Sequence, residues 1–102
     1  MKDQNLVIIE GVISSKFYVQ SEINDKGISA VNFTIFNSPN ENRKFRYAVV
    51  AWRPDPEKFI EAFKENDFVR ITGHLQATPT PIDNGKMAFL AKICADKVEL
   101  IQ

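Results

Sequence analysis

Residues 7–13 read VIIEGVI, and residues 69–75 repeat the same outline as VRITGHL. Both stretches alternate apolar side chains strictly, which is typical of strands with one buried face. In each, a glycine (Gly11 or Gly73) stands where a core-facing side chain is expected. Glycine inside a strand marks a bend, a bulge or a close backbone approach. Two bent strands near the two ends of a short chain indicate a small barrel that closes on itself.

The rest of the chain divides into further strands separated by turn residues. The strands that alternation predicts cover residues 5–19, bent at Gly11, and then 28–37, 43–52, 67–76 and 86–101. Between them we expect a turn at 24–27, a break at 38–42 and a proline-interrupted loop at 77–85. The chain therefore reads as five strands, the first of them unusually long.

A short helix is expected between the third and fourth strands. Asp55 is a good N-cap, Pro56 suits the first helical position, and Asn66 ends the helix in the left-handed region. The order β-β-β-α-β-β, with a long bent first strand, predicts an all-β fold: a five-stranded OB-fold barrel. The alternative is a β-sandwich, which would normally have more strands in a chain of this length.

The composition fits one globular domain, and we expect residues 1–102 to form it. Eight phenylalanines allow a compact core without a metal or a disulfide, and the single cysteine, Cys94, cannot form an internal disulfide. The apolar stretch at residues 6–9 is too short for a signal sequence or a membrane span. We therefore expect a cytoplasmic protein with no cofactor and no membrane contact.

The net charge argues against a strong overall field for nucleic acid. Lys and Arg together number 13, as do Asp and Glu, so the formal net charge is zero. Nucleic-acid binding would then depend on local charge and on base stacking.

Several segments, taken in order around the helix, carry a family resemblance. They are residues 5–13, Gly27 with residues 32–35, and residues 49–52, 66–75 and 93–98. This series resembles the bacterial and phage single-stranded DNA-binding protein family, which has the OB-fold, and it covers most of the chain. The resemblance implies a non-enzymatic, nucleoid-associated protein that binds single strands without sequence preference in replication, recombination or repair. It also implies a homodimer or homotetramer, and it leaves RNA open as a second ligand.

The sequence departs from the family pattern in three places. The chain ends at Gln102, directly after the last strand, where family members usually carry a flexible tail with acidic residues, so we expect no partner recruitment through such a tail. The family's stacking aromatic early in the third strand falls near Arg46, and the one between strands four and five falls near Pro81. Asn66 replaces the usual glycine before the fourth strand.

Single strands are held by aromatic platforms and by basic side chains that follow the phosphates. Trp52 and Arg46 share one side of the third strand, and Phe36 lies on the non-core side of the second. The candidate nucleic-acid-binding residues are Trp52, Phe36, Arg46, Arg43, Lys44, Arg53, Tyr18 and Lys86.

Each of these candidates also has a purely structural explanation. Trp52 could cap one end of the barrel, and Phe36 could cover the edge of the core or lie in an oligomer interface. Tyr18 could equally be an interface residue, Lys86 a surface residue, and the basic cluster at 43–46 a solvated edge.

The sequence contains no recognisable enzyme motif, and we expect neither catalytic nor metal-binding residues. It has no phosphate-binding glycine loop, no paired-cysteine spacing and no nucleophile elbow, and His74 is its only histidine. Two non-catalytic alternatives to DNA binding remain. One is an OB-fold protein-interaction module, such as a primosome-like accessory protein with weak nucleic-acid binding. The other, more remote, is an oligosaccharide-binding module.

Overall fold

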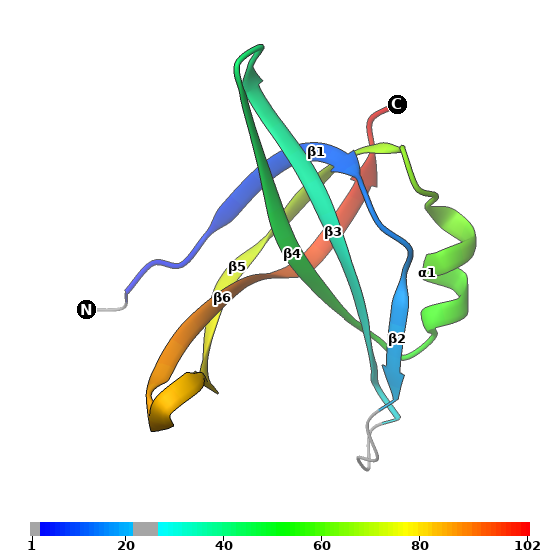
Figure 1. Cartoon of the computed structure of the whole chain (residues 1–102). Helices are drawn as coiled ribbons and strands as arrows, with labels where there is room; N and C mark the ends of the chain where they lie inside the picture. Colours follow the sequence, from blue (N-terminus) through cyan, green and yellow to red (C-terminus); the bar gives the residue numbers. More distant parts are fainter. Residues whose placement is uncertain (1–2, 22–26) are drawn as a thin grey trace.

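The computed structural model describes residues 3–21 and 27–102 (Figure 1). Its elements are β1 (Val7–Ile13), β2 (Tyr18–Ser21), β3 (Ser29–Asn40), β4 (Arg43–Arg53), α1 (Pro56–Ala62), β5 (Phe68–Pro81), a 3₁₀ turn (Asp83–Gly85) and β6 (Met87–Leu100). In the described part of the chain, no helix is long and apolar enough to cross a membrane.

The strands form one sheet that closes on itself. Their order is β1-β5-β6-β4-β3-β2, and β1 also pairs with β3, which closes the barrel. Strand β1 runs along β5 from Val7 opposite Gly73 to Val12 opposite Phe68, and its last two residues then pair with β3. Strands β4 and β6 pair in parallel, with Val49 opposite Ile93 and Val50 opposite Cys94. The chain therefore has the OB-fold, and the predicted five-stranded barrel with one helix between its third and fourth strands is confirmed.

Both glycines of the repeated outline lie where two backbones meet. A Cβ atom on Gly11 would overlap the carbonyl oxygen of Phe36 on β3. A Cβ atom on Gly73 would overlap the carbonyl oxygen of Cys94 on β6, beside a register shift in the β5–β6 ladder. Neither residue has a positive φ, so it is the missing side chain, and not backbone freedom, that is needed there. Of the three explanations that the sequence offers for a strand glycine, a bend, a bulge or a close backbone approach, the structure shows the close approach at both positions.

The core fills the barrel and is closed at one end by α1 (Figure 1). Asp55 caps the helix by accepting a hydrogen bond from the backbone nitrogen of Lys58 (3.4 Å). Phe59 is the buried residue of α1, and its ring lies 5.8 Å from that of Phe17 and 5.9 Å from that of Phe33. The fully buried aliphatic side chains around these rings are those of Ile13, Val31, Ile35, Val49, Val69 and Ile71.

The prediction of one continuous first strand over residues 5–19 is wrong, because the structure has two separate strands there, β1 and β2. At the two serines between them, side-chain hydrogen bonds to Thr34 of β3 accompany one backbone hydrogen bond, from the Ser14 nitrogen to the Thr34 carbonyl (2.9 Å). The hydroxyl of Ser14 lies 2.8 Å from that of Thr34, and the hydroxyl of Ser15 accepts a hydrogen bond from the Thr34 amide (2.9 Å). The barrel therefore turns its corner at these serines as well as at Gly11.

Two other predicted boundaries are also corrected. Strand β3 continues through the predicted break as far as Asn40, with a register shift against β4 between Asn37 and Asn40. Helix α1 ends at Ala62, and Asn66, although its φ is 78°, lies in the turn that follows and is not the cap. The predicted turn at 24–27 lies outside the described residues except for Gly27, whose φ of 63° fits a turn.

The predicted loop at 77–85 is wrong for most of its length, because β5 continues to Pro81 and pairs with β6 throughout. Prolines are tolerated here since this part of β5 is an edge. Its pairing with β1 ends at Gly73, and beyond it the side chain of Asn5 bonds both backbone groups of Leu75 (2.8 and 2.9 Å). The result is a long β5–β6 hairpin that projects from the barrel (Figure 1).

Candidate nucleic-acid interface

One side of the β3–β4 ladder faces away from the core and forms a continuous surface. Residues directly opposite each other in a ladder point to the same side. Four such pairs follow one another here, and we call them the β3–β4 track: Ala30 with Trp52, Asn32 with Val50, Thr34 with Ala48, and Phe36 with Arg46. Val31, Phe33 and Ile35 alternate with them and lie in the main core, so the track is on the opposite side of the sheet. On that side Ala30 and Val50 are themselves buried, together with Cys94, and Trp52 packs against them.

At one end of the track lies a groove of about 390 Å³, here called the Trp52 groove. Trp52 packs against Ala30, Val50 and Cys94 and remains partly exposed toward the groove. The opposite wall comes from the β5–β6 hairpin, through Gln76, Thr78, Thr80, Leu90 and Lys92, and Gln20 of β2 lines the groove as well. The groove therefore combines a wide aromatic surface, a cation and several hydrogen-bonding groups.

A second depression, of about 180 Å³, continues the groove along the track. Asn32 and Lys92 line both hollows and so connect them. Tyr18 lies opposite Asn32 on β2 and is two-thirds exposed. Tyr18 and Trp52 are thus two aromatic side chains on one surface, with the Lys92 ammonium group available to both hollows.

Farther along the track, the Arg46 guanidinium lies 4.6 Å from the centre of the Phe36 ring. A cation at this distance over an aromatic face is held by the ring's quadrupole and still presents its donors to solvent. Lys44 follows on the same side of β4 and, with Phe36, lines a third pocket. Of the eight predicted residues, the structure brings five to one surface: Trp52, Tyr18, Phe36, Arg46 and Lys44.

The other three predicted residues lie elsewhere. Arg53 points to the side of Phe59, with its guanidinium 5.4 Å from that ring, and donates a hydrogen bond to the Trp52 carbonyl (2.9 Å). Arg43 lies at the turn of the β3–β4 hairpin, opposite Asn40. Lys86 lies at the tip of the β5–β6 hairpin, outside all three hollows.

Sequence reasoning missed the contribution of the β5–β6 hairpin. Lys92, Gln76 and Thr78 contribute to one wall of the Trp52 groove, whereas the sequence predicts a loop at 77–85, which includes Thr78. A signal was available, because the polar residues at 76, 78 and 80 alternate with Ala77, Pro79 and Pro81. That alternation is the pattern of a two-sided strand, and the prolines obscured it.

Cys94 and His74 lie opposite each other in the β5–β6 ladder, next to the Trp52 groove. Burial raises the pKa of the Cys94 thiol, and the nearby carboxylate of Asp96 raises it further. The Nδ1 atom of His74 lies 3.5 Å from the Asp96 carboxylate, at the surface. Within residues 3–21 and 27–102, no three His, Cys, Asp or Glu side chains gather in a way that could hold a metal ion.

Comparison with known proteins gives a structural match. No protein-family model and no curated protein sequence matches the chain. Among solved structures, the chain is similar to the mitochondrial single-stranded DNA-binding protein Rim1 of S. cerevisiae, with a TM-score of 0.82 and 16% sequence identity. The match covers 99% of this chain and 98% of Rim1. At this identity the likeness establishes a shared OB-fold barrel over the whole length of both chains.

Proposed function

We propose that the protein binds single-stranded DNA along the β3–β4 track, without sequence preference and without catalysis. The observation that carries the proposal is the Trp52 groove, which Trp52 and Lys92 both line. Stacking on aromatic rings is independent of base identity, and cations in the same groove hold the phosphates. The resemblance to the bacterial and phage family and the likeness to Rim1 support the same ligand.

The charges are distributed unevenly over the surface, although the net charge of the chain is zero. No carboxylate lines the Trp52 groove or the second depression in the described part of the chain, whereas Lys92 lines both. Arg46 and Lys44 continue the cationic side chains along β4. The acidic residues are therefore kept off the track, and a polyanion meets mainly hydrogen-bond donors and cations there.

We further propose that the protein self-associates through the side of the hairpins opposite the track. Phe45, Tyr47, Leu75 and Phe89 continue the core-facing side of their strands beyond the barrel, where they are exposed. The β1 backbone from Val7 to Ile9 pairs with β5 along one edge only. An exposed apolar surface beside an open strand edge is typical of an interface between copies.

A role in replication, recombination or repair, in the nucleoid-containing cytoplasm, follows from the family resemblance and belongs to this proposal. RNA offers the same phosphates and base faces, so discrimination between DNA and RNA would have to come from contacts with the sugar.

The proposal is tested by titrating the intrinsic fluorescence of Trp52 with poly-dT at low salt. We expect quenching, and we expect Trp52→Ala to weaken binding by about 1–3 kcal/mol while the barrel stays folded. Ile82→Ala shortens an exposed apolar side chain at the hairpin tip, outside the groove and outside the proposed interface, and is the control. Absence of quenching at low salt, where electrostatic attraction is strongest, would exclude the proposal.

The apolar side of the hairpins also favours a second candidate, an OB-fold module that binds another protein. This candidate predicts weak oligonucleotide binding together with capture of a protein partner that survives nuclease treatment. Matched DNA and RNA oligonucleotides in the same titration separate the two nucleic-acid ligands from this outcome.

A further inference from the structure

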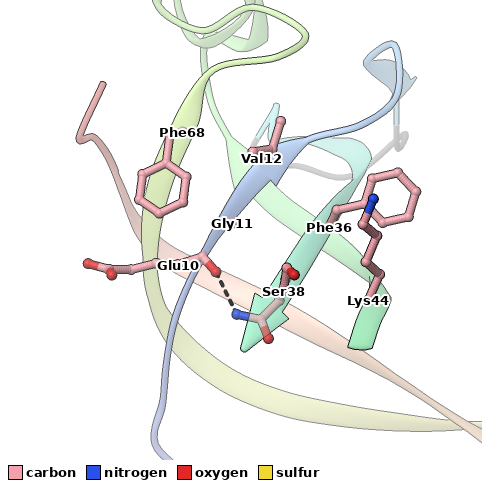
Figure 2. A pocket seen from close by; sticks show the side chains of 8 residues that line it. Glu10, Gly11, Val12, Phe36, Ser38, Lys44 and Phe68 are labelled. Carbon is pink, nitrogen blue, oxygen red and sulfur yellow. Dashed lines mark hydrogen bonds between the residues drawn. The ribbon is translucent and has the colours of Figure 1, made fainter. Parts of the chain in front are cut away.

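The third pocket lies beyond the Phe36–Arg46 end of the β3–β4 track and has a volume of about 500 Å³ (Figure 2). Strand β1 crosses between Phe68 on β5 and Phe36 on β3, and both rings line the pocket (Figure 2). Val12, which pairs with both of these residues, forms the wall between them, and Gly11 contributes only backbone. A hollow of this size with aromatic walls is typical of a site for a small planar group.

The charges around the pocket favour a phosphate-bearing ligand. Lys44 lines it, and the Arg46 guanidinium lies over the Phe36 ring at its edge. The one carboxylate in the lining, that of Glu10, is paired with Arg70 through contacts of 2.7 and 2.9 Å, so its charge is largely compensated. Lys44 in the lining and Arg46 beside the Phe36 ring therefore supply positive charge next to the pocket.

The polar groups inside the pocket are held in fixed positions. The Asn37 amide nitrogen donates a hydrogen bond to the Glu10 carbonyl (2.8 Å), the dashed line in Figure 2. This bond orients the amide so that its oxygen remains as an acceptor at the pocket. A base carries donors and acceptors around an apolar ring, and such a combination of aromatic walls and one oriented amide suits it.

The pocket is continuous with the proposed DNA path. From Trp52 to Lys44 on β4 is eight residues, which span about 26 Å at roughly 3.3 Å per residue. The three hollows follow one another over this length on the same side of the ladder. A strand that stacks on Trp52 and follows Lys92 and Arg46 would bring its bases to the pocket mouth.

We propose that this pocket receives one nucleobase of the bound single strand, against the rings of Phe36 and Phe68. The inference rests on the proposed DNA-binding function and adds a second base site to it, about the length of the track from Trp52. Lys44 and Arg46 contact the phosphates on either side of that base. The pocket thus fixes one end of the strand's path over β1.

Photo-crosslinking of the wild-type protein to oligo-dT carrying scattered 5-iodouracil tests the assignment, with the adducts mapped by mass spectrometry. We expect adducts on Phe36 or Phe68 in addition to Trp52. Adducts on Trp52 with none in the pocket would overturn this inference and leave the proposed function intact. If neither adducts nor binding are detected, the base site and the proposed DNA-binding function are both excluded.

An affinity measurement gives an independent test. Phe68→Ala should weaken oligo-dT binding about fivefold to a hundredfold, as loss of one stacked base would, and Phe68→Trp should retain affinity. Leu100→Ala is the control, since Leu100 is an exposed apolar residue at the end of β6, outside the pocket and outside the proposed interface. If a folded Phe68→Ala variant, checked by circular dichroism, binds like wild type, the base site is excluded.

Discussion

At the scale of single residues, the barrel depends on two positions that cannot carry a side chain. The carbonyl oxygens of Phe36 and Cys94 occupy the space that a Cβ on Gly11 or Gly73 would need. Both obstacles are backbone atoms within ladders, so relief requires two paired strands to move apart. This differs from a crowded side chain, which could rotate away.

Gly11→Ala and Gly73→Ala should each lower the free energy of unfolding by about 1–3 kcal/mol, because overpacking forces the strands apart. Urea denaturation followed by circular dichroism measures the change. Thr72→Ala, next to Gly73 but on the outward side of β5, is the control and should change stability by about 0.5 kcal/mol or less. Alanine variants as stable as wild type would show that the two backbones are not in contact.

Cys94 is a second residue whose surroundings determine its chemistry. Burial, and then the charge of Asp96, raise the pKa of its thiol, so the folded protein holds the proton more tightly than the unfolded chain does. The resulting stability is fully present below the unfolded pKa of about 8.5 and is lost as the pH rises through the higher folded pKa. At neutral pH the thiol is therefore protonated and unreactive.

The rate of Cys94 modification by a disulfide reagent should rise with pH, with a midpoint above that of an ordinary cysteine near 8.5. The same chain in urea, where the thiol is exposed, provides the reference midpoint. A native midpoint at or below the urea value would contradict the assigned environment.

At the scale of elements, alternation of apolar residues was sufficient to predict the barrel strands, because their core-facing sides are uniformly apolar from Val31 to Ile35 and from Val69 to Ile71. It was insufficient at the hairpins, where Ser38, Pro79 and Pro81 resemble turn residues. These residues lie in edge or irregular ladder positions, and whether a strand has a free edge depends on its partners. Only the tertiary structure supplies that information.

The same distinction explains which site residues could be predicted. Trp52, Phe36 and Arg46 share one side of two correctly predicted strands. The alternation of side chains along a strand is therefore sufficient to place them together. Arg53 was added for its position next to Trp52 in the sequence, but consecutive strand residues point to opposite sides. Lys92 was missed because its place opposite Trp52 comes from the path of the β5–β6 hairpin.

If the protein binds single strands as proposed, the β5–β6 hairpin should make its own contribution, which a charge change can measure. Lys92→Gln should weaken single-strand binding and reduce the slope of log K against log salt by about 0.7, the value for one phosphate contact. Lys97→Gln is the matched control, because Lys97 is also on β6 but lies opposite Thr72, with its ammonium 3.6 Å from the Glu99 carboxylate. Equal slopes for the two variants would place the phosphates away from the hairpin.

At the scale of the whole molecule, the two hairpins give the barrel two unlike surfaces. On one side Gln76, Thr78 and Lys92 accompany the track. On the other side the same strands carry only apolar residues in this stretch, namely Leu75, Ala77, Pro79 and Phe89. A monomer would leave this apolar side in water, whereas the proposed self-association would bury it and leave the track free for the proposed DNA ligand.

Self-association through that side should be visible in solution. We expect light scattering to give a mass that is a multiple of 11.6 kDa, and Phe45→Glu combined with Phe89→Glu to shift it toward the monomer, because two carboxylates would be buried in the interface. Ile82→Glu places the same charge on an exposed apolar residue at the hairpin tip and should leave the mass unchanged. A wild-type mass of one chain at all concentrations would contradict the interface. Equal dissociation by the control would instead mean that the contact lies at the tips of the hairpins and not along their apolar side.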